Sequence, residues 1–163
     1  MNYEQFIKEL DFKLANYFEL HKAYIHCKPG CSACCEKGDY PLTSIELEYL
    51  MKGYIALDNT TKQVVQQNIN SMKKGGVCPF LVDKKCSVYA HRPIICRVHG
   101  LAYRYKENKL KLPYCANYGL NYANILKNGE IIIDIVFENL DTQNILKTSE
   151  FGETRNLYDW IKR

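Results

Sequence analysis

The sequence predicts a small α+β domain, mostly helical with short β-hairpins, organised around a cysteine-rich metal centre. Three observations support this prediction. Eight cysteines occur in 163 residues, and four of them lie in the stretch 27–35. Apolar residues recur with helical spacing on both sides of that stretch. Short alternating segments, separated by turn residues, then follow between 78 and 112.

Four segments have the apolar spacing or the end signals of a helix: 3–21, 44–57, 60–74 and 153–162. Thr43 and Glu46 have the form of a capping box at the start of the second segment. Gly75-Gly76 is expected to end the third, because glycine readily adopts the conformation that closes a helix.

Two hairpins are expected in the second half of the chain. Cys78 and Cys86 would lie at the shoulders of the first, and the second would join 101–105 to 109–112. Between them, Pro93 permits a short helical turn carrying Cys96 and Arg97. The run 131–137 is so apolar that we expect it to be a core strand or helix.

The composition indicates a cytoplasmic protein of one domain, residues 1–163, with the cysteine motifs between 27 and 115. Acidic residues interrupt the N-terminal segment, so it does not have the pattern of a secretory signal. No run approaches the roughly 20 apolar residues needed to span a membrane. The net charge of +4 is mild, so basic residues near the cysteines are better explained as a solvated face than as a nucleic-acid site.

The density of thiols predicts a bound metal. Several thiolates must converge within about 2.3 Å of one centre to hold it, whereas disulfides are disfavoured in a reducing compartment. All eight cysteines are candidate ligands: Cys27, Cys31, Cys34, Cys35, Cys78, Cys86, Cys96 and Cys115. Neighbouring side chains diverge, so one of the vicinal pair Cys34 and Cys35 is expected to serve a second site or a structural or redox role.

The identity of the metal stays open between zinc and an iron–sulfur cluster. Four thiolates suit tetrahedral zinc and a 4Fe–4S cluster equally well. Zinc ribbons usually have two C-x2-C pairs, and only Cys31 and Cys34 have that spacing, so the C-x3-C-x2-C pattern favours iron–sulfur. Radical S-adenosylmethionine enzymes share this spacing, but 163 residues are few for their large α/β barrel.

Several other side chains are candidates for roles near the metal. Arg92 and Arg97 could donate hydrogen bonds to cluster sulfurs or bind an anionic substrate, or they could bind backbone carbonyls around the loop. His26 and His99 are candidate ligands or donors, whereas His21 is expected on the surface or on a helix face. A nucleophilic Cys–His pair is disfavoured, because a metal-bound thiolate is not a free nucleophile.

Three motifs occur in order: Cys27-x3-Cys31-x2-Cys34-Cys35, then Cys78-Pro79-Phe80-Leu81, then Cys86-x-Val88-Tyr89-x2-Arg92-Pro93-x2-Cys96-Arg97. Together they resemble the bacterial CxxCxxCC cysteine-cluster family. The resemblance implies a zinc- or iron-chelating domain, with Cys115 as the last cysteine. Flagellin lysine methylase resembles the same family, which implies an alternative function as an iron–sulfur-dependent group-transfer enzyme. After Cys96-Arg97 that family usually has an aromatic residue and a proline, where this chain has Val98-His99-Gly100.

Overall fold

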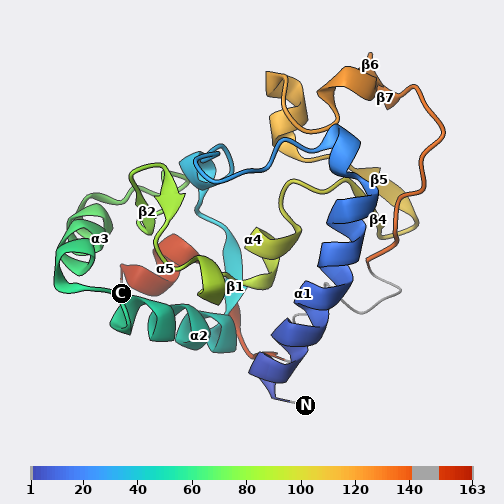
Figure 1. Cartoon of the computed structure of the whole chain (residues 1–163). Helices are drawn as coiled ribbons and strands as arrows, with labels where there is room; N and C mark the ends of the chain where they lie inside the picture. Colours follow the sequence, from blue (N-terminus) through green and yellow to red (C-terminus); the bar gives the residue numbers. More distant parts are fainter. Residues whose placement is uncertain (1, 141–150, 163) are drawn as a thin grey trace. The chain divides into compact units, whose positions relative to one another are not determined.

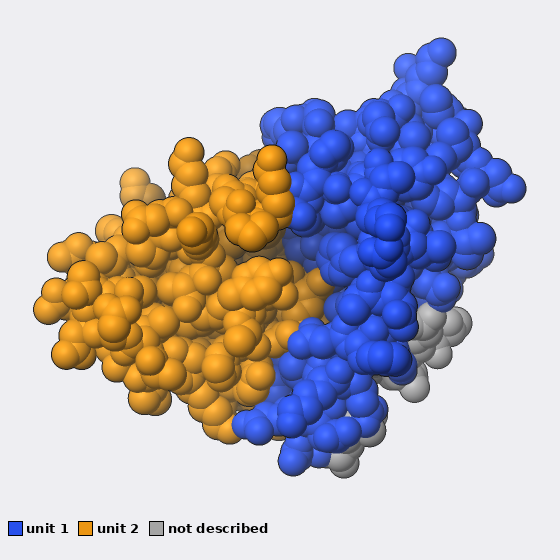
Figure 2. All heavy atoms as spheres, viewed as in Figure 1, with its two compact units in different colours: residues 1–27, 98–147 blue, residues 28–97, 148–163 orange. Residues whose placement is uncertain are grey.

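The structure is a computed structural model that describes residues 2–140 and 151–162 (Figure 1). Those residues form five α-helices and four two-stranded antiparallel pairs, in agreement with the α+β class. The chain divides into two compact units (Figure 2). Unit 1 comprises residues 1–27 and 98–147, and unit 2 comprises 28–97 and 148–163. The prediction that 1–163 is one domain stays a prediction. Within the described ranges, no helix is both long and apolar enough to cross a membrane.

Unit 1 begins with helix α1 (Tyr3–Leu20), close to the range predicted from the sequence. The Asn2 side chain accepts the N–H of Gln5 at 2.8 Å and so caps the first turn. The buried residues recur every three or four positions and form one stripe: Tyr3, Ile7, Leu10, Leu14 and Tyr17. The helix is therefore held by packing along one face.

Among the described residues, unit 1 also contains two hairpins and three short 3₁₀ turns. Strands β4 (Tyr103–Tyr105) and β5 (Lys109–Lys111) form the predicted second hairpin. Strands β6 (Leu126–Lys127) and β7 (Glu130–Ile131) form another, joined by Asn128-Gly129 with positive φ at both residues. This is the two-residue turn that suits the twist of a hairpin. The 3₁₀ turns are η1 (Lys22–Tyr24), η4 (Tyr114–Tyr118) and η5 (Ala123–Ile125).

The prediction that 131–137 is a core strand or helix is wrong. Only its first residue belongs to a strand, and Ile132 and Val136 are 58% and 69% exposed. Phe137 is buried against the cluster around Tyr122. The short β7 leaves the rest of the segment without a regular ladder, so apolar character alone did not determine its burial.

His21 is completely buried at the C-terminal end of α1, so of its two expected positions, the surface or a helix face, the surface is wrong. Its Nδ1 lies 3.0 Å from the Tyr122 hydroxyl, and its Nε2 lies 3.0 Å from the carbonyl of Val136. A carbonyl only accepts, so Nε2–H donates to Val136 and Nδ1 accepts from the tyrosine. Burial lowers the pKa of His21, since it penalises the charged ring.

Unit 2 contains the remaining helices and sheets. Helix α2 (Ser44–Ile55) starts with the predicted capping box: the Thr43 hydroxyl accepts the Glu46 N–H, and the Glu46 carboxylate accepts the Thr43 N–H. Helix α3 (Asn59–Ser71) ends before the glycines expected to stop it, because the backbone already leaves the helical conformation at Met72.

The end of the described chain packs back on the start of unit 2. Strand β8 (Thr154–Asn156) pairs with β1 (Pro41–Thr43), and helix α5 (Leu157–Ile161) follows it directly. The buried residues of the unit's apolar cluster come from β1, α2, α3, α5 and the loops around the β2–β3 hairpin: Leu42, Leu50, Val65, Met72, Phe80, Val88 and Leu157. Cys78 and Cys86 pack against this core.

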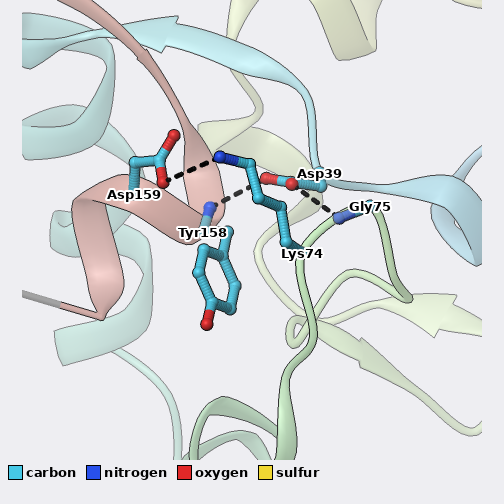
Figure 3. Close-up of polar contacts among 5 residues, drawn as sticks. All are labelled: Asp39, Lys74, Gly75, Tyr158 and Asp159. Carbon is cyan, nitrogen blue, oxygen red and sulfur yellow. Dashed lines mark hydrogen bonds and ion pairs between the residues drawn. The ribbon is translucent and has the colours of Figure 1, made fainter.

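Asp39 ties the segment after the first cysteine loop to two other parts of unit 2 (Figure 3). Its Oδ1 accepts the N–H of Tyr158 at 2.8 Å, and its Oδ2 accepts the N–H of Gly75 at 2.7 Å. Beside them, Lys74 Nζ lies 3.5 Å from Asp159 Oδ1. One carboxylate therefore fixes the first turn of α5 and the loop after α3 together.

Candidate metal centre

The first cysteine loop is built from two consecutive turns. The Cys31 N–H donates to the Lys28 carbonyl at 3.0 Å across Pro29-Gly30, and Gly30 has a φ of +92°. This is the turn for which proline followed by glycine is suited. The Cys35 N–H then donates to the Ser32 carbonyl at 2.8 Å, and the 3₁₀ turn η2 (Cys35–Lys37) follows. Regular helix is thus excluded from the segment 28–34.

The second cysteine segment is joined to the first loop through the main chain. The Cys78 N–H donates to the Cys35 carbonyl at 2.8 Å. A Cβ added to Gly38 would lie 2.3 Å from the Cys78 Cβ, so only glycine permits this approach. The sequence motifs did not single out Gly38. The only feature of the sequence that could have indicated its role is its position just after the cysteine loop.

The predicted hairpin with cysteines at its shoulders is confirmed. Strands β2 (Leu81–Val82) and β3 (Lys85–Cys86) pair so that Leu81 lies opposite Cys86. The Asn68 side chain on α3 donates to the carbonyls of Pro79 and Leu81 at 3.1 and 3.3 Å. The turn that carries Cys78 is therefore held against helix α3.

Cys96 lies on the short helix α4 (Ile94–Val98), again as predicted. The N–H of Ile94 donates to Oε1 of Glu46 at 2.8 Å, and Glu46 is 1% exposed. A buried carboxylate of α2 thus fixes the start of the helix that presents Cys96. Sequence alone predicted only the capping role of Glu46.

The two candidate arginines have different surroundings. Arg97 is buried, and it donates to the carbonyls of Arg92 and Ala90 at 2.8 and 2.7 Å. Arg92 donates through Nε to the Tyr89 carbonyl, and its guanidinium lies 3.5 Å from the centre of the Tyr89 ring. Both therefore bind backbone carbonyls around the loop, the alternative that the sequence left open. Whether either contacts a cofactor or substrate stays a prediction.

The sulfurs of Cys34 and Cys35 lie 4.0 Å apart, so the divergence expected of this vicinal pair is absent. A tetrahedral site with metal–sulfur bonds of about 2.3 Å separates its sulfurs by about 3.8 Å. The hydrogen bond from the Cys35 thiol lowers the pKa of Cys34 to about 7, against the opposing effect of burial. The same bond raises the pKa of Cys35, and burial and nearby thiolates add to the rise.

Three further thiols belong to the same electrostatic neighbourhood. Burial raises the pKa of Cys78 to about 12, and the charges of Cys86 and Cys34 add to this rise. Burial also raises the pKa values of Cys86 and Cys96, whereas the positive charge of Arg92 lowers both. We call these five thiols the unit 2 cysteine cluster: Cys34, Cys35, Cys78, Cys86 and Cys96.

The other three predicted ligands lie outside this cluster. Cys31 is exposed in the first loop of unit 2. Cys27 and Cys115 belong to unit 1. Burial raises the pKa of Tyr122 there, and the charges of these two cysteines add to the rise. Cys115 is buried, and the Cys27 sulfur accepts a hydrogen bond from the Asn121 side chain at 3.1 Å.

The two candidate histidines both lie in unit 1. His26 is exposed, and its main-chain N–H donates to Asn121. Burial lowers the pKa of His99 to about 4, and the positive charge of Lys111 adds to this effect. His99 is thus a neutral imidazole at pH 7. The prediction that either one is a ligand stays a prediction.

The thiols fit a metal by chemical type. All eight are free thiols. Among residues 2–140 and 151–162, however, no three His, Cys, Asp or Glu side chains are arranged to hold one metal ion. Metal binding therefore requires the thiols of the cluster to turn toward a common centre. It also requires them to lose protons, since only thiolates are effective ligands.

Comparison with known proteins identifies a family over the part of the chain that contains the cysteines. Residues 26–116 match the model of the CxxCxxCC family, described as a "putative zinc- or iron-chelating domain". An uncharacterised protein of Methanocaldococcus jannaschii, MJ0661, is 33% identical over 97 residues, which cover 55% of this chain and 51% of that protein. The chain thus spans about half the length of this relative. No solved structure matches.

Proposed function

The chain belongs to the CxxCxxCC family, and from this premise we propose that it binds zinc or iron through clustered cysteine thiolates. The observation that carries the proposal is the unit 2 cysteine cluster. Its five thiols come from the first loop, the region of the β2–β3 hairpin and helix α4. The sulfurs of Cys34 and Cys35 lie 4.0 Å apart, and the Cys78 N–H donates to the Cys35 carbonyl at 2.8 Å. Thiols from distant parts of a chain gathered in this way are suited to one soft metal centre.

The proposed ligands are drawn from all eight cysteines, with the cluster supplying the primary set. Cys31 would add to this set, and Cys27 and Cys115 of unit 1 would serve a second site. Arg92 would reduce the negative charge that several thiolates create, because its charge already lowers the pKa values of Cys34, Cys86 and Cys96. Such a centre also implies reduced thiols, so we propose a cytoplasmic location.

Between the two metals, we propose an iron–sulfur cluster: thiolate ligands suit both, and the C-x3-C-x2-C spacing favours the cluster. Anaerobic purification followed by elemental analysis and a visible spectrum tests this. Iron with matching sulfide and a brown colour is the expected result. Colourless protein with stoichiometric zinc would replace the iron–sulfur proposal, and protein that binds neither metal after reconstitution would refute metal binding itself.

Serine substitutions test the ligands individually. We expect Cys34→Ser and Cys31→Ser to lower both the metal content and the melting temperature of the loaded protein, since a hydroxyl is a poor ligand for a soft metal. Ser32→Ala, in the same exposed loop, is the matched control and should retain both. Full metal content in either cysteine variant would remove that residue from the ligand set.

The alternative, group transfer supported by an iron–sulfur cluster, makes a further prediction that simple metal binding does not. One iron would need an open coordination position for a methyl donor. Addition of S-adenosylmethionine to the reduced protein should then change its electron paramagnetic resonance spectrum. An unchanged spectrum would leave metal binding as the function and remove this alternative.

A further inference from the structure

Asn121 joins three segments of unit 1 through a side chain that is 2% exposed. Its Oδ1 accepts the main-chain N–H of His26 at 2.7 Å. Its Nδ2 donates to the Gly100 carbonyl at 2.7 Å and to the Cys27 sulfur at 3.1 Å. No cysteine motif includes this residue, and it lies outside residues 26–116 that match the family.

The partners of Asn121 determine the orientation of its amide. A main-chain N–H can only donate, so the atom facing His26 is the oxygen. A carbonyl can only accept, so the atom facing Gly100 is the nitrogen. The second N–H of Nδ2 is therefore directed at the Cys27 sulfur, which must act as the acceptor.

Gly100 provides the space in which the sulfur lies. Its φ is +95°, and an added Cβ would lie 2.7 Å from the Cys27 sulfur and 3.0 Å from Asn121 Nδ2.

From these contacts we propose that Asn121 is a positioning residue for Cys27: it holds the ligand sulfur by an N–H···S hydrogen bond, in the space left by Gly100. The inference rests on the proposed function, because it takes Cys27 as a metal ligand. An amide donor stays bound when the sulfur becomes a metal thiolate, and it stabilises the negative charge there. Donors of this kind hold metal ligands in place, and their loss typically weakens metal binding about 10–100-fold.

The contact itself can be tested in metal-free, reduced protein by nuclear magnetic resonance. Cys27→Ala should shift the side-chain amide signals of Asn121, because it removes the acceptor. Cys31→Ala, at an exposed cysteine of unit 2, is the control and should leave those signals in place. Unmoved Asn121 signals in Cys27→Ala would overturn the proposal.

The role toward the metal can be tested with Co²⁺ as the probe. Asn121→Ser removes the donor, and Gly100→Ala fills the space of the sulfur. We expect each to release Co²⁺ to a chelator about tenfold faster or more and to shift the sulfur-to-cobalt absorption band. Gly119→Ala is the matched control for Gly100→Ala, because Gly119 also has a positive φ of +77° but its Cβ would meet nothing within 4 Å.

Each outcome of the cobalt experiment bears on the proposal. Wild-type release and spectra in both Asn121→Ser and Gly100→Ala would overturn it while leaving the proposed function intact. If Asn121→Ser does not fold, as judged by circular dichroism, the comparison of Gly100→Ala with Gly119→Ala decides between the outcomes. Wild-type protein that binds no Co²⁺, zinc or iron would refute the proposed function and the metal role of Asn121 together, and the resonance experiment would still report the contact.

Discussion

Glu46 and Ile94 are joined by a buried hydrogen bond: Oε1 of the carboxylate accepts the Ile94 N–H at 2.8 Å, across 48 positions of the chain. The other carboxylate oxygen accepts the N–H of Thr43 at 2.7 Å. A single side chain therefore caps α2 and holds the first residue of α4, which carries Cys96.

We expect Glu46→Gln to lower the free energy of unfolding by about 2–3 kcal/mol, because an amide nitrogen would replace one acceptor and face a main-chain N–H. Chemical denaturation of the metal-free protein measures this. Glu48→Gln is the control, since Glu48 is exposed on the same helix. Equal stability of the two variants would show that the Glu46 contacts contribute nothing.

Gly38→Ala is expected to move the first cysteine loop away from the segment that carries Cys78. The added Cβ would lie 2.3 Å from the Cys78 Cβ, so the two segments would have to move apart. Overpacking of this kind costs about 1–3 kcal/mol. We expect lower metal content as well as a lower melting temperature, measured on reconstituted protein. Unchanged metal content would mean that the register of the two segments does not matter for binding.

Lys84→Gly should stabilise the β2–β3 hairpin. Asp83 and Lys84 have φ values of 49° and 59°, a conformation that strains residues with a side chain. Glycine relieves that strain at some cost in the entropy of the unfolded chain, for a net gain of about 0.5–1 kcal/mol. Thermal unfolding measures the gain. Lys84→Ala keeps the strain and should show no gain, and a similar rise in both variants would assign the effect to lost charge instead.

The stability of the protein should fall in mild acid because of His21. Its pKa is lowered by burial, whereas the unfolded chain titrates near 6.5. As the pH falls below about 6.5, the His21 ring binds a proton in the unfolded state but not yet in the folded state. The free energy of unfolding contributed by the neutral ring is therefore present above pH 6.5 and is lost as the pH falls toward the lower pKa of the folded state. The charge of Glu138 opposes the shift without cancelling it.

His21→Gln is the variant that isolates this effect, because glutamine can donate to the Val136 carbonyl and accept from Tyr122 without titrating. The free energy of unfolding of the variant, followed from pH 7.5 to 5, should depend less on pH than that of the wild type. Identical pH profiles would show that other groups cause the acid sensitivity.

Local signals in the sequence predicted the elements that carry the cysteines. The capping box at Thr43 and Glu46, the two hairpins and the turn after Pro93 each depend on residues a few positions apart, and each occurs in the structure. Asn128-Gly129 is an equally local signal for the β6–β7 hairpin, but the apolar run after it suggested a core segment instead.

Contacts between distant residues could not be predicted in the same way. The burial of His21 depends on Tyr122 and on the carbonyl of Val136, which lie more than 100 positions away. The approach of Cys78 to Gly38 and the second role of Glu46 likewise depend on the completed packing of unit 2. The cysteine motifs identified candidate ligands, but not how the thiols would be grouped or which side chains would hold them in place.

The hydrogen bond between the Cys78 N–H and the Cys35 carbonyl uses no sulfur atom. Oxidation or replacement of either thiol therefore leaves the main-chain donor and acceptor of this hydrogen bond unchanged. If the protein binds a metal as proposed, we expect the two binding segments to keep this backbone register when the metal is lost.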